Sequence, residues 1–139
     1  MTNKAITPEL SRQALAGSFP GDLGIELLRI ADDEVHGRMV VDARHLHPGG
    51  IVHGGAWTAF ADTVAAWGTM RNVPEGTDFS TVEMKTNVFR AGRPGDVLEA
   101  VGRPLHLGRT TQAWEVRVTS GGKAAAHFVC TQMVLPPRT

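Results

Sequence analysis

The sequence lacks the residues that several common kinds of site require. Cys130 is the only cysteine among 139 residues, so no intrachain disulfide can form and a zinc site with several cysteine ligands is excluded. Tyrosine is absent and aromatic residues make up 6%, which argues against a surface that stacks nucleic-acid bases. The 14 basic residues balance 14 acidic ones, without the basic excess of a general nucleic-acid binder. We therefore expect no nucleic-acid partner.

Long hydrophobic runs are also missing, with one exception. The N-terminal stretch MTNKAITPELSRQ has no apolar core of the kind that a signal peptide carries. The longest apolar segment, Gly54–Met70, is slightly short for a membrane span and has Asp62 in its middle. We expect a cytoplasmic protein without a membrane partner, in which this segment is a buried helix.

The stretch from His47 to Met70, HPGGIVHGGAWTAFADTVAAWGTM, is the one around which the chain is organised. A glycine-dense loop leads into a segment that is apolar or small on every side, which is typical of a helix buried in a core. Asp62 is the only charged residue from Gly54 onward in this stretch. An ionised carboxylate is costly there unless it is paired or its pKa shifts. Asp62 is therefore either a structural residue whose charge is paired or neutralised, or a functional residue that the helix serves to position.

The rest of the chain predicts one short helix and a set of strands. Thr7 is a plausible N-cap for a helix that ends at Leu15, because Pro8 and Glu9 suit a first turn. Residues 17–21 are expected to end that helix. Strands are expected at residues 23–30, 35–41, 80–90, 97–107, 111–119 and 124–135, with a loop at 42–50 and turns at 73–76, 93–96, 108–109 and 121–122.

Short links between the last four strands imply antiparallel pairing. We expect an α+β fold in one domain, residues 1–139, with residues 1–18 as an N-terminal helical extension and one sheet wrapped against one long helix. Such a sheet leaves its edges poorly protected, and dimerisation is the simplest remedy.

These features resemble the hotdog-fold acyl-CoA thioesterases, closest to the branch of PaaI-type and 4-hydroxybenzoyl-CoA thioesterases. The resemblance is carried by His53-Gly54-Gly55 followed after six residues by Asp62 and Thr63, by the segments 87–90 and 105–109, and by the Gly95-Asp96 turn. It covers roughly residues 19–135. It implies a long central helix wrapped by a curled antiparallel sheet, in homodimers that often pair into a homotetramer.

The resemblance also implies roles for five residues. Asp62 would be the catalytic carboxylate, acting on a thioester as a base or as a nucleophile. The backbone N–H of Gly54, and next that of Gly55, would form an oxyanion hole at the N-terminus of the helix. His53 would either brace this loop or contact the substrate. The family often has Asn or Gln where this chain has His47, and an imidazole could replace that amide only in one tautomer or in its charged form.

The spacing between Gly54 and Asp62 predicts how the site is assembled. Gly54 and Asp62 are eight residues apart, or about 12 Å along a helix, which is too far for both to meet at one carbonyl. We therefore expect a site that joins Gly54 of one chain to Asp62 of another.

Further candidates for substrate contact are Trp57, Thr81, Val82, Arg90, Arg93, Arg109 and Thr110. Arginine suits the phosphates of CoA because its guanidinium offers a fork of donors, although each of these arginines could equally be a solvated turn residue. Trp57 could equally be a core residue, and we expect Glu83 on a solvated face. His45, His47 and His53 could hold zinc. Thioester hydrolysis needs no metal, however, so we expect no cofactor beyond the CoA of the substrate.

The sequence thus predicts an acyl-CoA thioesterase that hydrolyses an acyl- or aryl-CoA thioester to the free acid and CoA. One alternative is a non-catalytic module that binds acyl-CoA, against which the retained buried acid counts. Another is an enoyl-CoA hydratase, which the His-Gly-Gly arrangement fits poorly. The identity of the acyl group is not readable from the sequence.

Overall fold

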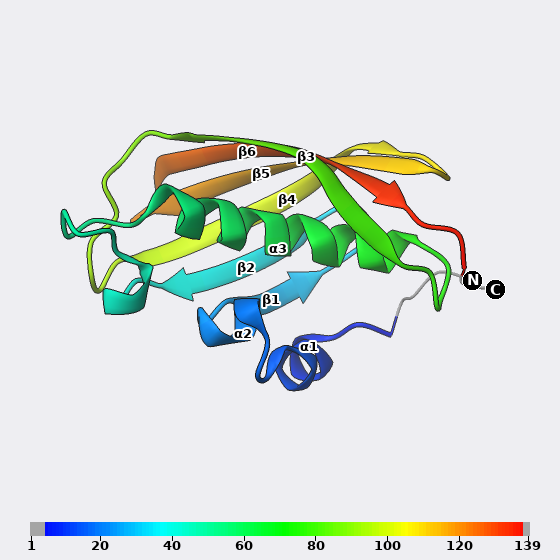
Figure 1. Ribbon diagram of the computed structural model, residues 1–139, viewed down its shortest axis with the longest axis horizontal. Coiled ribbons are helices and arrows are strands. Elements are labelled where there is room, and N and C mark those ends of the chain that lie inside the picture. The colour runs from blue at the N-terminus through cyan, green and yellow to red at the C-terminus, as the bar shows by residue number, and fades with distance from the viewer. Residues whose placement is uncertain (1–4, 138–139) are drawn as a thin grey trace.

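The computed structural model describes residues 5–137, and it consists of one curled sheet around one long helix (Figure 1). The ends of the expected domain, residues 1–4 and 138–139, lie outside the described residues. The elements are α1 (Pro8–Leu15), α2 (Phe19–Asp22), β1 (Glu26–Ile30), β2 (Val35–Val40), the 3₁₀ turn η1 (Ala43–His45), α3 (Gly54–Asn72), β3 (Phe79–Val88), β4 (Val97–Leu107), β5 (Thr111–Ser120) and β6 (Lys123–Val134). The six strands lie in the order β1-β2-β4-β5-β6-β3, and each neighbouring pair is antiparallel. The predicted α+β architecture is confirmed.

The expected positions fail mainly near the N-terminus. Thr7 caps α1 as predicted, since its side chain accepts a hydrogen bond from the N–H of Leu10 at 3.2 Å. Residues 17–21 were expected only to end that helix, but they lead into α2, which has Pro20 in its first turn. The first strand consequently begins at Glu26 rather than at residue 23. A helix of four residues is too short to show a hydrophobic period, so the pattern could not reveal it.

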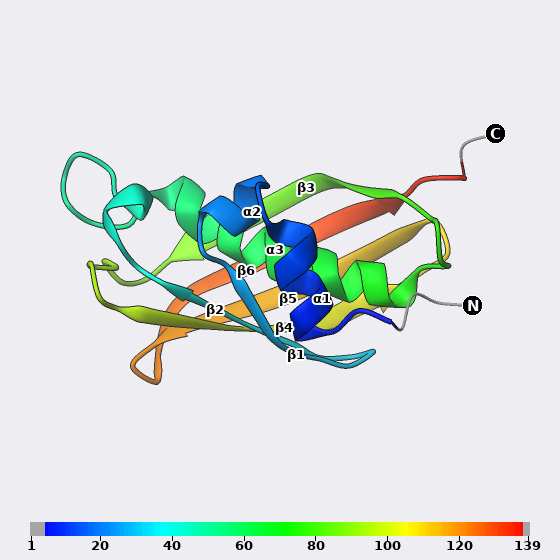
Figure 2. The same cartoon turned by 90° about the horizontal axis from the view of Figure 1, so that it is seen from below.

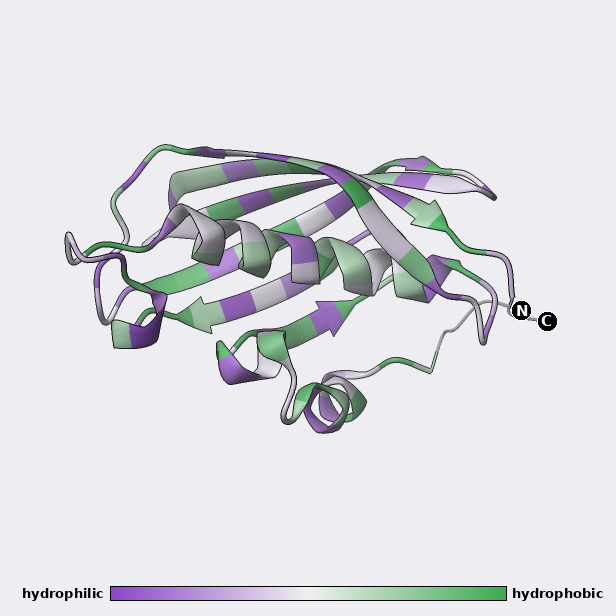
Figure 3. Cartoon of the chain, viewed as in Figure 1, coloured by the Kyte–Doolittle hydropathy of each residue, from purple (hydrophilic) through white to green (hydrophobic). Residues whose placement is uncertain are grey.

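The face of α3 that packs on the sheet supplies the centre of the core. Trp57, Phe60 and Val64 are buried there, and Phe60 and Val64 have no exposed surface. Gly68 lies against Trp114 of β5, where an added Cβ would overlap the indole ring. Figure 3 shows strands banded in alternating hydrophilic and hydrophobic colours, whereas α3 is mostly pale or hydrophobic. That banding is typical of a sheet with one buried face and one solvated face.

The two edges of the sheet differ in what covers them. α1 packs against β1, and Figure 2 shows α1 crossing the molecule on that side. At the opposite edge, β3 carries the exposed apolar side chains Val82, Met84 and Val88. Among the described residues, no helix is long and apolar enough to cross a membrane.

Candidate active site

Asp62 lies midway along α3 and is half-buried. The hydroxyl of Thr81, on β3, donates a hydrogen bond to Asp62 Oδ1 at 2.9 Å. Burial raises the pKa of Asp62 above its usual range, and the hydrogen bond from Thr81 offsets part of that rise. A carboxylate held in this way is more basic than one in water, as abstraction of a proton from water requires.

A bulge in β3 allows the strand to reach α3 at two points. Besides the contact between Thr81 and Asp62, the hydroxyls of Thr86 and Thr58 lie 2.8 Å apart. Thr81 and Thr86 are five residues apart, so regular alternation would place them on opposite faces of the strand. The register against β6 shifts after Thr81, which leaves Val82 as an extra residue and returns Thr86 to the helix side.

Two residues of β6 lie near Asp62 and were not predicted from the sequence. Gln132 pairs with Thr81 across the sheet, has no exposed surface, and donates from Nε2 to Thr81 Oγ1 at 3.2 Å. Cys130 is also buried, and burial together with the negative charge of Asp62 raises its pKa to about 12. The signal for Gln132 was present as the one polar residue that follows the apolar inward residues Ala126, Phe128 and Cys130 of the strand.

At the start of α3, one of the two predicted oxyanion donors is engaged within the chain. The N–H of Gly55 donates to Nδ1 of His53 at 2.8 Å, so His53 braces the loop as the N-cap of the helix. The N–H of Gly54 has no acceptor within residues 5–137. A Cβ added at Gly54 would meet no heavy atom within 4 Å, so this position is open to a ligand. Of the two glycines, Gly54 is therefore the available donor.

The tautomer of His47 follows from its hydrogen bond. Its Nδ1 accepts from the N–H of Gly49 at 2.8 Å. A neutral imidazole that accepts at one nitrogen carries its proton on the other, so His47 presents an Nε2–H donor. That is the tautomer in which His47 could stand in for the N–H of an amide side chain.

The other two histidines of the loop are occupied in the same way. Nδ1 of His53 accepts from Gly55, and Nδ1 of the buried His45 accepts from the N–H of Asp42 at 3.0 Å. His45 also contacts the carbonyl oxygen of Leu23 through Nε2 at 2.7 Å. Within the described part of the chain, no three His, Cys, Asp or Glu side chains form a group that could hold a metal ion.

The remaining candidate residues are dispersed over the chain. Trp57 is 2% exposed and packs in the core, as the alternative interpretation expected, and its role as a substrate contact stays a prediction. Arg90 is exposed and donates to the carbonyl of Ala124 at 3.0 Å. The exposed Arg93 lies in a turn, where its N–H donates to Asp96.

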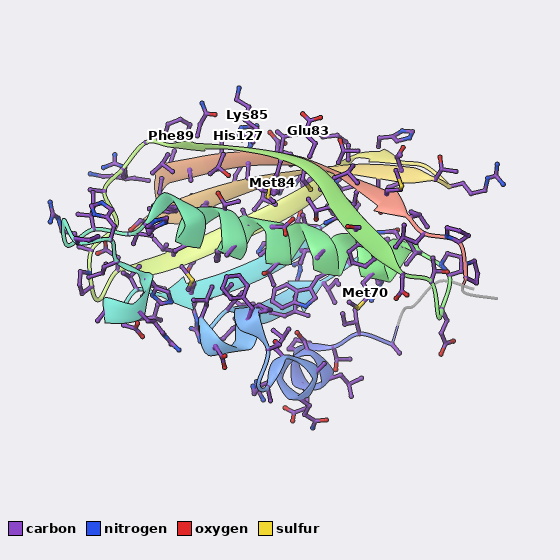
Figure 4. All side chains as sticks on the ribbon, in the orientation of Figure 1. Met70, Glu83, Met84, Lys85, Phe89 and His127 are labelled. Carbon is purple, nitrogen blue, oxygen red and sulfur yellow. The ribbon has the colours of Figure 1, made fainter. Side chains whose placement is uncertain are left out.

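Arg109 and Thr110 line a cavity of about 480 Å³ between the end of α3 and the ends of β4 and β6. Figure 4 shows that Glu83 and Lys85 project outward from the sheet, whereas Met84 lies on the side of α3. Glu83 therefore occupies a solvated face, as expected. None of the candidate residues Arg90, Arg93, Arg109 and Thr110 has a hydrogen bond to Asp62 within the described chain.

Comparisons with known proteins show which family and which solved structures this chain is similar to. A family model described as "Thioesterase superfamily" matches residues 49–126. Over 111 residues, the chain is 35% identical to the proofreading thioesterase EntH of Cronobacter turicensis, covering 80% of each. The fold is similar to a mutant of thioesterase PA1618 from Pseudomonas aeruginosa, with TM-score 0.91 and 28% identity over 97% of this chain and 98% of that one. It is also similar to a hypothetical thioesterase from Streptococcus pneumoniae solved with coenzyme A, with TM-score 0.74 and 27% identity over 83% and 91%.

Proposed function

Because this chain belongs to the thioesterase superfamily and hydrolyses thioester bonds, we propose that Asp62 is its catalytic carboxylate, acting on an acyl- or aryl-CoA thioester. The predictions of a hotdog fold and of a thioesterase are confirmed. The observation that carries the catalytic assignment is the half-buried Asp62, whose pKa burial raises and which accepts a hydrogen bond from Thr81. That assignment is tested by Asp62→Asn with a panel of acyl- and aryl-CoA thioesters and a thiol reagent that detects free CoA.

The reaction proceeds from the groups at the two positions on α3. The thioester carbonyl oxygen accepts a hydrogen bond from the N–H of Gly54, which stabilises negative charge on that oxygen as the carbonyl carbon is attacked. In one route, Asp62 takes a proton from water while the water oxygen bonds to the carbonyl carbon. The carbon–sulfur bond then breaks, and CoA leaves as a thiolate that takes up a proton.

In a second route, Asp62 itself attacks the carbonyl carbon and forms a mixed anhydride, which water then hydrolyses. A single turnover in H₂¹⁸O tests the second route. Label in the Asp62 carboxylate establishes an anhydride that water attacks at the aspartyl carbon, and absence of label from Asp62 counts against that attack. Neither route uses a metal or a redox cofactor, so we expect full activity after dialysis against a chelator.

The arrangement of α3 supports a homodimer in the proposal. Gly54 and Asp62 lie on one continuous helix, about 12 Å apart along its axis and about 80° apart around it. They cannot converge on one carbonyl within a chain, whereas Gly54 of one protomer and Asp62 of its partner can. The exposed apolar side chains of β3 offer a surface for that pairing. A dimer of dimers is the larger assembly we propose.

Mixing two inactive variants tests the shared site. Asp62→Asn retains Gly54, and Gly54→Pro retains Asp62 but has no N–H at that position. If sites form between protomers, an equimolar mixture that exchanges subunits recovers about a quarter of wild-type activity, because half of the dimers carry one intact site of two. If each site lies within one chain, mixing recovers no activity.

We further propose that Arg90, Arg93, Arg109 and Thr110 contact the CoA portion of the substrate, and that the protein is cytoplasmic. Arg109 and Thr110 line the cavity at the end of α3, and coenzyme A is present in one similar structure. Arg109→Ala is expected to raise KM for an acyl-CoA and to leave KM unchanged for the corresponding acyl-pantetheine, which has no nucleotide. An equal rise in both KM values would contradict the phosphate contact.

A further inference from the structure

Two hydrogen bonds in series connect the interior of the sheet to Asp62. Gln132 on β6 donates from Nε2 to Thr81 Oγ1 at 3.2 Å, and Thr81 Oγ1 donates to Asp62 Oδ1 at 2.9 Å. A threonine hydroxyl has one proton and two lone pairs. Because Gln132 supplies a proton to one lone pair, the single proton of Thr81 is free to point at Asp62.

We propose that Gln132 is a positioning residue for thioester hydrolysis. By donating to Thr81, it sets the direction of the Thr81 O–H and so holds the Asp62 carboxylate ionised and correctly oriented. This inference rests on the catalytic role proposed for Asp62. It adds a residue of β6 that has no hydrogen bond to Asp62 within the described chain and acts on Asp62 through Thr81.

Packing alone does not explain a glutamine at this position. Gln132 has no exposed surface, and its Oε1 atom has no hydrogen-bond partner among residues 5–137. An unpartnered buried carbonyl lowers stability, and an apolar side chain of similar length avoids that cost. The preceding inward residues of β6 are Ala126, Phe128 and Cys130, which are apolar and buried. The contact with Thr81 is what distinguishes the amide from such a side chain.

Among the described residues of the sheet, Thr81 is the one whose side chain donates a hydrogen bond to Asp62. Cys130, also on β6, has a pKa of about 12 and is a neutral thiol over the working range of pH. Glu83 and Lys85, the nearby charged residues of β3, project away from α3 (Figure 4). The pKa of Asp62 is raised by burial and lowered by the Thr81 hydrogen bond. A change in the direction of that O–H should therefore reach Asp62 directly.

Four variants separate this role from packing. Gln132→Met keeps the length of the side chain and removes the donor. Gln132→Glu keeps its shape but, when ionised, accepts the Thr81 proton that Asp62 otherwise receives. Thr81→Val removes the hydroxyl, and Thr81→Ser retains it as the matched control. For each, we would measure kcat and KM against pH, the melting temperature, and the pKa of Asp62 by ¹³C NMR, with its resonance identified by its loss in Asp62→Asn.

In Gln132→Met, we expect the NMR pKa of Asp62 and the acidic limb of kcat to move up by about one pH unit. On that limb, kcat falls by about tenfold, while KM is unchanged and the melting temperature is not lowered. Gln132→Glu moves the limb at least as far, and Thr81→Ser leaves it near the wild-type position. In the Thr81→Val background, Gln132→Met causes no further shift, because the group through which it acts is absent.

An unmoved pKa of Asp62 in Gln132→Met, with Asp62→Asn inactive, overturns this inference and leaves the proposed function standing. A full additional shift in the Thr81→Val background also overturns it, since Gln132 would then not act through Thr81. Near-wild-type turnover by Asp62→Asn overturns the proposed function itself and, with it, any role of Gln132 in the reaction.

Discussion

The two edge strands of the sheet, β1 and β3, differ in length, in charge and in what covers them. β1 has five residues, is packed against α1, and forms ion pairs with β2 and the turn beside it, such as Glu26 with Arg38 at 2.9 Å. β3 has ten residues and exposes Val82, Met84 and Val88. A short, charged and covered edge strand prevents pairing with another chain, whereas a long apolar edge strand favours association with one.

The difference locates function on the open edge. Thr81 of β3 contacts Asp62, and Thr86 of the same strand contacts α3 one helical turn nearer Gly54. The covered edge bears none of the residues to which we assign chemistry. β1 and α1 therefore close the sheet within the chain, while β3 contributes to both the proposed active site and the proposed dimer.

The largest effect is expected at the carboxylate beside the open edge. Asp62→Asn should lower kcat by three orders of magnitude or more, as loss of a catalytic base or nucleophile does (~10³-fold or greater). Steady-state assays with the best CoA thioester of the panel measure it. Turnover within a few-fold of wild type would remove Asp62 from the mechanism.

The same variant has an opposite effect on stability. Burial raises the pKa of Asp62 in the folded chain, so the folded state holds the proton more tightly than the unfolded one and ionised Asp62 destabilises the fold. Asp62→Asn should therefore melt at a higher temperature than wild type at neutral pH. The difference should shrink as pH falls through the raised pKa of the folded state, and it should be absent below the usual aspartate pKa of about 3.9, where both side chains are neutral. Thermal melts across pH check it.

The next effect is expected at Gly54, and it isolates one backbone proton. Gly54 is the first residue of α3, where proline is well tolerated, and His53 before it has φ −63° and ψ 139°, as a residue before proline prefers. Gly54→Pro should keep the helix and lower kcat by about 10²–10³-fold through loss of the oxyanion donor. Gly54→Ala keeps the N–H and is the matched control. Equal losses in both variants would indicate a steric effect.

A matched pair of lysine substitutions tests the two edges against each other. Met84 on β3 is 49% exposed and Leu28 on β1 is 43% exposed, so the solvent exposure of the two side chains is similar. Met84→Lys should halve the mass found by analytical ultracentrifugation and lower activity with it, because charge is costly in an apolar interface. Leu28→Lys should change neither. Dissociation by both variants, or by neither, would show that the edges do not differ in this way.

The smallest effect is expected from the ion pairs of the covered side. Glu34 contacts His36, Arg29 and Arg103, and the hydrogen bond from His36 does most to lower its pKa. Glu34→Gln should lower the melting temperature by a few degrees at most and leave kcat unchanged, since such pairs are solvent-screened. Because its pKa is lowered in the folded chain, Glu34 stabilises the fold only when it is ionised, at pH values above that pKa. The difference in melting temperature between Glu34→Gln and wild type should therefore vanish on acidification. A loss of activity would contradict the division between the two edges.

The sequence pointed to the parts of the candidate site that lie close together along the chain. Asp62 and the Gly54 loop stand out because a charge and a glycine cluster are anomalous in an apolar helical segment. Gln132 and the direct contact of Thr81 with Asp62 were missed, because they depend on which residues pair across β3 and β6. Gly55 was expected as a second donor, but whether its N–H is free depends on the rotamer of His53. The pattern of residue types along the chain reports on local structure. Which residues pair across two strands, and which rotamer a side chain adopts, are set by tertiary packing.

The bulge at Val82 makes this enzyme sensitive to the length of one strand rather than only to its residues. Between Thr81 and Thr86, the chain must contain one residue more than simple alternation allows. Deleting any single residue of that interval keeps both threonines in the sequence yet turns one of them to the outer face. Two related sequences that share every catalytic residue can thus differ in activity through a one-residue gap. An alignment should therefore be judged at Val82 by its spacing as well as by its identities.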